Sequence, residues 1–214
     1  TRRIRTRPAV AADAPPAARR PHRARLRGFD PALRGLAHTA PEAPDLVERT
    51  VALLTEAGID HDLAERRPLA HGARVPLHRM DPTASWPVAQ LSLTHQDAHR
   101  HLALGRALAP LLEEDVLLLA SGAMTYALGE IDDWSESPET APDWVRAFAD
   151  WAAECLARGA LDVLLDWERQ APWARRNHPS PEHLMPLFVA LGAAGPDAAA
   201  QHLHRSASRR VLAM

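Results

Sequence analysis

The residues best suited to chemistry lie together in one short stretch, residues 177–187, which reads Asn-His-Pro-Ser-Pro-Glu-His-Leu-Met-Pro-Leu. His178 and His183 can exchange protons or bind a metal near neutral pH, and Glu182 adds a carboxylate directly before the second histidine. This combination predicts a site for acid–base or metal chemistry. The alternative is an ordinary helix start whose histidines are surface residues, because histidine-rich motifs often match by chance.

A helix is expected to position these groups. Ser180 suits the N-cap, and Pro181 suits the first helical position, where a missing backbone N–H costs nothing. Glu182 and His183 then fall in the first turn, where a helix favours a carboxylate and presents N–H groups to anionic oxygens. The other face of this helix is expected to be buried through apolar residues at helical spacing, namely Leu184, Leu187, Phe188 and Leu191.

Two further residues stand at turns, where functional residues are common. His71 precedes Gly72 in a stretch that is expected to be a loop. Tyr126, the only tyrosine of the chain, follows a turn made by Ser121 and Gly122. The plain structural alternatives are a loop histidine bonded to the backbone and a half-buried aromatic residue whose hydroxyl finds a partner.

The strongest strand prediction is the continuous apolar run at 115–122. Such a run is typical of a central parallel strand whose carboxyl end opens into a crevice. Together with a strand at 86–93 and a helix at 96–112, it predicts a right-handed β-α-β unit. We therefore expect an α/β fold of three layers, in which helices flank a mostly parallel central sheet.

The remaining predicted elements are helices at 44–58, 142–158 and 161–167, a short strand at 59–63 and a marginal helix from 197 onward. Asp45 and Glu48 resemble a capping box for the first of these helices. Residues 1–27 are rich in arginine, proline and alanine. This segment is interpreted as a strand at 3–10 and then a loop, although a basic arm or a targeting peptide is an alternative. Residues 28–214 are expected to form a single domain.

Composition narrows the function classes. The net charge is -2, so the chain lacks the basic surface that a nucleic-acid partner requires. Its apolar runs are shorter than the roughly 18 residues that a membrane-spanning helix needs, and no membrane partner is expected. Cys155 is the single cysteine, which rules out an internal disulfide and favours a cytoplasmic location.

Taken in order, several motifs resemble the class III extradiol ring-cleavage dioxygenases, the LigB-like group, and within it the DOPA-dioxygenase-type branch. The resemblance runs from about residue 28 to residue 195. The residues that carry it are Gly28-Phe29, Ala43 to Gly58, His71-Gly72-Ala73, Val75-Pro76-Leu77, Gln90-Leu91-Ser92-Leu93, Leu104-Gly105-Arg106-Ala107-Leu108, Ala120-Ser121-Gly122, Trp144, Phe148 and His178-Pro179-Ser180-Pro181-Glu182-His183-Leu184.

The resemblance implies metal-dependent opening of a catechol-type aromatic ring with O₂, at one non-haem Fe(II) or, in some preparations, zinc. It implies that His183 matches a metal-site histidine, whereas His71 and His178 match histidines of the substrate pocket and are catalytic candidates. A homo-oligomer is compatible with it. The other residues expected to border the substrate are Ser121, Gly122 and Glu182.

The sequence also departs from the family pattern. Tyr126 stands where the pattern has a histidine, and its ordinary pKa of about 10 suits proton transfer near neutrality poorly. The family's opening strands, which end in His-Gly-Ser-Pro and Ser-x-His-Trp, are missing, and Thr1 matches the position just after the second. Two readings remain: a shortened dioxygenase, or a degenerate homologue that serves as a small-molecule-binding or protein-interaction module.

Overall fold

The structure is a computed structural model that describes residues 3–6, 38–64, 69–94, 97–131 and 141–214. Its central sheet has three strands, β1 (Arg3–Thr6), β2 (His61–Ala64) and β3 (Gln90–Ser92), in the order β2-β1-β3. Strand β1 runs antiparallel to β2 and parallel to β3, so Ile4 lies opposite Leu63 on one side and Leu91 on the other. Ile4 is buried, which places the middle strand in the core.

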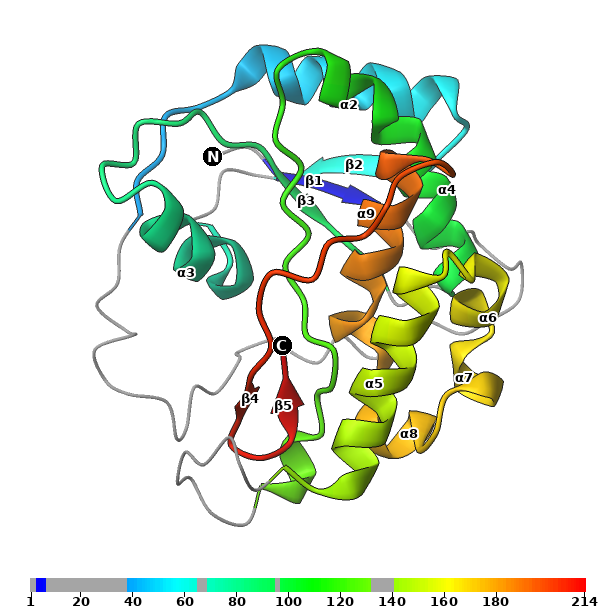
Figure 1. The fold of residues 1–214 in the computed structure, drawn as a ribbon. Helices are drawn as coiled ribbons and strands as arrows, with labels where there is room; N and C mark the ends of the chain where they lie inside the picture. The colour runs from blue at the N-terminus through cyan, green and yellow to red at the C-terminus, as the bar shows by residue number, and fades with distance from the viewer. Residues whose placement is uncertain (1–2, 7–37, 65–68, 95–96, 132–140) are drawn as a thin grey trace, which may run out of the picture.

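Helices make up most of the described chain (Figure 1). The α-helices are α2 (Pro44–Glu56), α3 (His71–Met80), α4 (Ala98–Leu108), α5 (Asp143–Ala157), α6 (Leu161–Leu165), α7 (Trp167–Gln170), α8 (Ala174–Asn177) and α9 (Met185–Ala194). In the described residues the 3₁₀ turns are η1 (Ala109–Glu113), η2 (Leu128–Glu130) and η4 (Pro181–His183). The C-terminal hairpin of β4 (Ala207–Ser208) and β5 (Leu212–Ala213) lies at the end of the molecule away from α2 (Figure 1).

Helix α9 is the centre of the packing. One cluster of buried residues joins it to the sheet, α2 and α4 through Val189, Ile4, Leu54 and Leu108. A second cluster joins it to α5 and the short helices that follow, with Phe188 at its centre. A helix that packs on several sides is expected to be apolar all round, as the sequence of α9 is.

Two glycines let α4 and α9 approach very closely. A Cβ atom added to Gly105 would lie 2.1 Å from the backbone oxygen of Val189, and one added to Gly192 would lie 2.2 Å from that of Leu102. Neither position can carry a side chain without separating the helices. Both glycines therefore fix the distance between α4, which follows β3, and α9, which follows the turn at 177–183.

Several predictions are confirmed. The protein is an α/β domain, and helices occur where they were expected at 44–58, 96–112 and 142–158, with α6 and α7 after them. Strand β1 lies within the predicted 3–10, β3 within 86–93, and β2 overlaps the predicted 59–63. The helix expected to begin at Pro181 instead begins at Met185 with Leu184 as its N-cap, so Glu182 and His183 lie in the separate 3₁₀ turn η4. Ser180 precedes this turn, and its hydroxyl donates to Glu182 Oε1 at 2.9 Å instead of capping the backbone.

The strand predicted at 115–122 is wrong, because none of these residues pairs in a described sheet. In Figure 1 the segment runs between α3 and α9 as an irregular stretch. Val116 and Leu118 pack on the cluster around Ile4, which accounts for their apolar character, whereas Leu117 is 66% exposed. A strand-forming sequence becomes a strand only beside a partner. The expected β-α-β unit is therefore not formed by these residues, and the described sheet is mixed instead of mostly parallel.

The loop expected around His71 is also wrong, since α3 begins at this residue. Pro76 lies inside α3, where it has no N–H to give to the carbonyl of Gly72, and this made a helix hard to predict. Two tertiary contacts hold the helix in place. The amide of Ala70 donates to Gln90 Oε1 of β3 at 2.7 Å, and Leu77 is buried.

Two smaller predictions are wrong as well. The tail after 197 forms the β4–β5 hairpin, whose turn holds Arg209 and Arg210 at φ of 49° and 63°. The expected capping box at Asp45 does not form, because the N-cap of α2 is Ala43 and no side chain caps this helix. Across the residues that the structure describes, no helix is long and apolar enough to cross a membrane.

Candidate functional site

The centre of the candidate site is a pair of stacked rings. Tyr126 and His183 lie face to face, with ring centroids 3.3 Å apart and planes inclined by 10°. Glu182 Oε1 lies 3.8 Å from His183 Nδ1, and the side chains of His183 and Glu182 are 33% and 37% exposed. The sequence predicted each of these residues, and the structure brings a phenol, an imidazole and a carboxylate together at a partly exposed position.

Backbone hydrogen bonds hold the two segments of the site together. The amide of Ala123 donates to the carbonyl of His183, and the amide of Tyr126 donates to that of Asn177, both at 2.9 Å. Gly122 allows this approach, because a Cβ at this position would lie 2.3 Å from the His183 carbonyl oxygen. The turn predicted at Ser121-Gly122 is thus pressed against η4.

His178 lies behind this contact and not beside the stacked rings. It is 3% exposed and packs against Phe148 and Trp167, with ring centroids 5.3 and 5.6 Å away. Its Nε2 donates to the carbonyl of Met124 at 2.8 Å. Burial lowers the pKa of His178 to about 4, although this hydrogen bond opposes the change, so the ring is neutral near neutral pH.

Both stacked rings are uncharged near neutral pH, mainly because they are partly buried. Burial raises the pKa of the Tyr126 phenol above its ordinary value, and the Glu182 carboxylate raises it further. Burial lowers the pKa of His183, an effect that Glu182 partly offsets. Near neutral pH the pair is therefore a neutral phenol on a neutral imidazole, and Tyr126 holds its proton too tightly to shuttle it.

The remaining predicted residues lie at the edge of this arrangement. A Cβ added to Gly72 would lie 3.5 Å from Ser121 Oγ, so the first turn of α3, with His71, approaches the Ser121-Gly122 turn. Ser121 and Gly122 are exposed, and His71 is half-buried. The structure thus brings His71, Ser121 and Gly122 to one neighbourhood.

The donors in the described part of the chain do not make up a mononuclear iron site. A non-haem Fe(II) site of the common oxygenase kind uses two histidines and one carboxylate. His183 and Glu182 supply one of each, and a neutral phenol such as Tyr126 is a poor third ligand. No cluster of three or more His, Cys, Asp or Glu residues suited to a metal occurs within the described ranges. His183 and Glu182 would need further ligands to hold iron or zinc.

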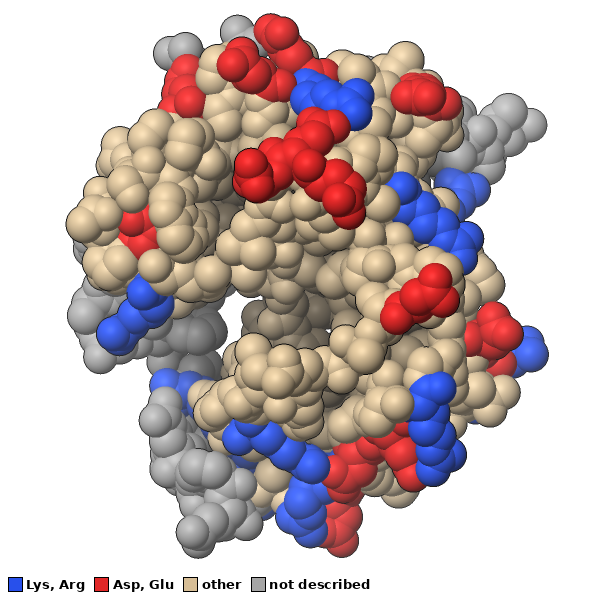
Figure 2. Space-filling view, turned by 45° about the horizontal axis from the view of Figure 1, so that its top comes forward, with Lys and Arg blue, Asp and Glu red and all other residues tan. Residues whose placement is uncertain are grey.

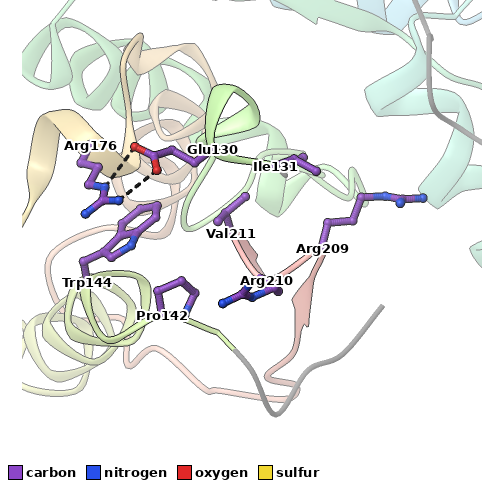
Figure 3. A pocket seen from close by; sticks show the side chains of 8 residues that line it. All are labelled: Glu130, Ile131, Pro142, Trp144, Arg176, Arg209, Arg210 and Val211. Carbon is purple, nitrogen blue, oxygen red and sulfur yellow. Dashed lines mark hydrogen bonds and ion pairs between the residues drawn. The ribbon is translucent and has the colours of Figure 1, made fainter. Parts of the chain in front are cut away.

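Two hollows in the surface lie elsewhere. One, of about 180 Å³, is lined by Arg176, Glu130 and Trp144 among others (Figure 3). Its Arg176 pairs with Glu130 at 2.9 Å and lies 4.4 Å above the Trp144 ring. The other, of about 210 Å³, lies between α5 and the C-terminal tail. Tyr126 and His183 line neither, and we place the site at the stacked pair because partly exposed groups with shifted pKa values gather there.

Charged side chains are mixed in sign over the face shown in Figure 2. Acidic side chains gather toward the top of this view, whereas acidic and basic groups are interspersed along its right and lower edges. Near the centre the surface is hollowed, and the described residues that border this hollow are mostly uncharged.

Comparison with known proteins defines the class. The family model described as the catalytic LigB subunit of aromatic ring-opening dioxygenase matches residues 16–211. The chain belongs to this family of extradiol ring-opening dioxygenases.

Relatives with assigned activities support this membership. The chain is 40% identical to the 4,5-DOPA dioxygenase extradiol of Beta vulgaris over 183 residues, which cover 85% of this chain and 67% of that protein. It is 36% identical to the protein of the same name from Mirabilis jalapa, covering 79% of this chain and 62% of that one. It is 32% identical to the Escherichia coli K12 protein of this name, and the match covers 78% of this chain and 61% of that one. The chain therefore spans about two thirds of the length of these relatives.

A solved structure has the same fold. The crystal structure of an uncharacterized protein from Escherichia coli K12 matches with a TM-score of 0.69, covering 100% of this chain and 78% of that chain. The two sequences are 22% identical, so this likeness concerns the fold alone.

Three residues that hold the site together were not predicted. Asn177 and Thr125 are fully buried, and Met124 provides the carbonyl that His178 binds. Asn177 stands in the predicted stretch, next to a histidine, but a single sequence gives no sign that an asparagine is buried. The only available signal was the position of Thr125 directly before the conspicuous Tyr126.

Proposed function

We propose that this family member binds a catechol-type aromatic ring at the Tyr126–His183 pair. The observation that carries the proposal is the parallel stack of two neutral rings beside a carboxylate. The partly exposed imidazole and carboxylate can bind the two hydroxyl groups of a catechol, and the Tyr126 ring adds an aromatic contact. Such aromatic contacts are worth about 0.5–1.5 kcal/mol beyond the buried area.

The other predicted residues near the stacked pair also have roles in this proposal, whereas the buried His178 does not touch the ligand. Glu182 accepts a hydrogen bond from a catechol hydroxyl, which is a strong bond because the acceptor is charged. His183 meets the second hydroxyl, and Ser121 with Gly122 leaves the approach open because both are exposed. His71 borders the same approach from α3.

Opening of the bound ring with O₂ is a more specific activity than binding, and the names of the relatives favour it. It requires a metal, for which we propose Fe(II), or zinc as a substitute, with His183 as one ligand. A bound metal would activate the catechol and O₂. Glu182 and His183 are short of the ligands that this needs, so we propose ring opening only for a form in which further ligands complete the site. The family's metal-dependent chemistry and the single buried thiol of Cys155 agree with a reducing, cytoplasmic setting.

Binding is tested by titrating metal-free protein with 4-nitrocatechol, whose visible absorption changes with its surroundings. We expect saturable binding at one site, a loss of at least tenfold in affinity for Tyr126→Ala and His183→Ala, and little change for Tyr126→Phe, which keeps the ring. His202→Ala, in the exposed tail, is the control. Binding that is absent, or equal in all variants, would contradict the proposal.

The second candidate function is a binding module without turnover, favoured by the incomplete ligand set and by Tyr126 at the family's histidine position. The two candidates separate when protein is loaded with Fe(II) under anaerobic conditions, given catechols and then exposed to O₂. Yellow ring-opened product with stoichiometric iron identifies the dioxygenase. Catechol binding with neither iron binding nor product identifies the binding module.

A further inference from the structure

The segment 123–126 is attached to the turn 177–183 at three points. Its two ends are held by the backbone bonds of Ala123 to His183 and of Tyr126 to Asn177. Between them, His178 Nε2 donates to the carbonyl of Met124 at 2.8 Å. The side chain of His178 thus occupies the middle of a contact whose ends carry the two stacked rings.

Asn177 is itself fixed by its side chain. It is 0% exposed, and its Nδ2 donates to the carbonyls of Trp144 at 3.1 Å and of Trp173 at 3.2 Å. These bonds tie it to the first turn of α5 and to the residue before α8. Asn177 is the last residue of α8, so its carbonyl, which receives the Tyr126 amide, is held where α8 meets α5 and is a rigid anchor for the main chain of Tyr126.

His178 is a fixed hydrogen-bond donor and not a proton carrier. A carbonyl can only accept, so the proton of the neutral ring must be on Nε2. Nδ1 is buried and has no hydrogen-bond partner among the residues that the structure describes. The ring is held by Phe148 and Trp167 on the core side and is almost fully buried.

The opposite edge of the same segment is held by the C-terminal hairpin. Thr125 Oγ1 donates to the carbonyl of Val211 at 2.9 Å and accepts from the amide of Ala213 at 2.7 Å. The amide of Met124 donates to the carbonyl of Ala213 at 2.9 Å. With both edges bonded, the backbone at Tyr126 is immobilised, and its side chain is directed at His183.

We propose that His178 and Asn177 are positioning residues, which act through Met124 and the Tyr126 backbone to hold the Tyr126 ring on His183. Preorganisation of this kind makes a site effective, because a loosely held group loses binding energy when it must be ordered. The consequence for ligand binding rests on the function proposed above. The positioning itself is a property of the free protein.

The test uses Tyr126 as its own reporter, since it is the only tyrosine. Protein made with 3-fluorotyrosine gives one ¹⁹F resonance, and His183→Ala defines how far the imidazole shifts it. His178→Gln places an amide N–H near the position of Nε2, whereas His178→Asn places it near Nδ1 and leaves the Met124 carbonyl unpaired. These two variants are matched in chemistry and differ in reach.

The expected result is a rescue pattern. His178→Gln keeps the wild-type resonance, whereas folded His178→Asn and Asn177→Ala move it toward the His183→Ala value and weaken 4-nitrocatechol binding about tenfold, the loss of one hydrogen bond. Equal resonances in the Gln and Asn variants would overturn the proposal. A merely stabilising residue would lower the melting temperature without moving the resonance of the folded state.

A second measurement covers the case in which the Asn variant does not fold. In wild-type protein with ¹⁵N-labelled histidine, His178 must carry its proton on Nε2 at neutral pH, and a proton on Nδ1 would overturn the inference. Failure of the two proposals is distinguishable. A correct ¹⁹F pattern without 4-nitrocatechol binding removes the proposed function alone, whereas normal 4-nitrocatechol binding with the same resonance in the Gln and Asn variants removes the positioning role alone.

Discussion

The ring of Tyr126 covers the imidazole of His183 in a parallel stack, with 3.3 Å between the ring centroids. By family resemblance, the first residue stands at a histidine position and the second at a metal-ligand position. Two positions expected to serve proton transfer and metal binding are thus joined in a neutral aromatic pair. We interpret the pair as a surface for a flat aromatic molecule, and its geometry depends on close approaches that can be tested one by one.

Gly122→Ala is expected to destabilise the protein by about 1–3 kcal/mol, because the new methyl group would lie 2.3 Å from the His183 carbonyl oxygen. Gly129→Ala is the matched control, since its Cβ would meet nothing within 4 Å. Its effect is expected to stay within about 0.5 kcal/mol. Urea unfolding of both variants measures the difference, and equal stability would show that Gly122 does not lie against η4.

Gly105→Ala and Gly192→Ala are each expected to cost about 3 kcal/mol or more, since either methyl group would enter the backbone of the facing helix. Alanine favours a helix by about 1 kcal/mol over glycine, so propensity alone predicts the opposite sign. Ala103→Gly on the exposed side of α4 isolates that propensity. Thermal melts in which the two glycine variants gain stability would refute the close packing of α4 on α9.

Stability is expected to fall between pH 6.5 and pH 4 because of His178. Its pKa is about 4 in the folded protein and 6.5 ordinarily, so below pH 6.5 the unfolded chain binds a proton that the folded protein does not. The loss grows as the pH falls and levels off below pH 4. A shift of this size corresponds to at most about 3 kcal/mol.

The control for this pH dependence is His178→Gln, which has no imidazole to titrate. Nearby charges come from His183, which lowers the pKa of His178, and from Glu182, which raises it. Both remain in the variant, so the difference between the two unfolding curves isolates His178. Parallel curves from pH 7 to pH 4 would show that His178 is not buried as a neutral ring.

Amphipathic helices were the easiest part of the fold to predict from sequence. The spacing of the apolar residues in α2 and α5 predicts both helices, because one face of each helix packs on the core and the other is exposed. The strand predicted for the apolar run at 115–122 was wrong because strand formation depends on a neighbouring strand, which residue propensity does not reveal. Helix α3 contains Pro76 and depends on a contact with Gln90, so its signal is tertiary.

The site was predictable where residue chemistry is visible. The sequence predicted His183, Glu182 and Tyr126 because ionisable and aromatic residues at predicted turns and helix starts indicate function. His178 was found for the same reason, but its burial against Phe148 could not be predicted. The part that Asn177 plays depends on the main-chain carbonyls of Trp144 in α5 and of Trp173 just before α8, and no pattern of residue types records such contacts.

The central claim is that a catechol-type ring is bound at the Tyr126–His183 pair, and the most direct measurement follows the single ¹⁹F resonance of 3-fluorotyrosine-labelled, metal-free protein during a catechol titration. The account predicts a saturable shift of this resonance, with a dissociation constant that matches the one obtained by competition with 4-nitrocatechol. In His183→Ala the shift is not expected at the wild-type catechol concentrations. A resonance that stays unchanged while catechol binds would contradict it, because the ring would then be bound elsewhere.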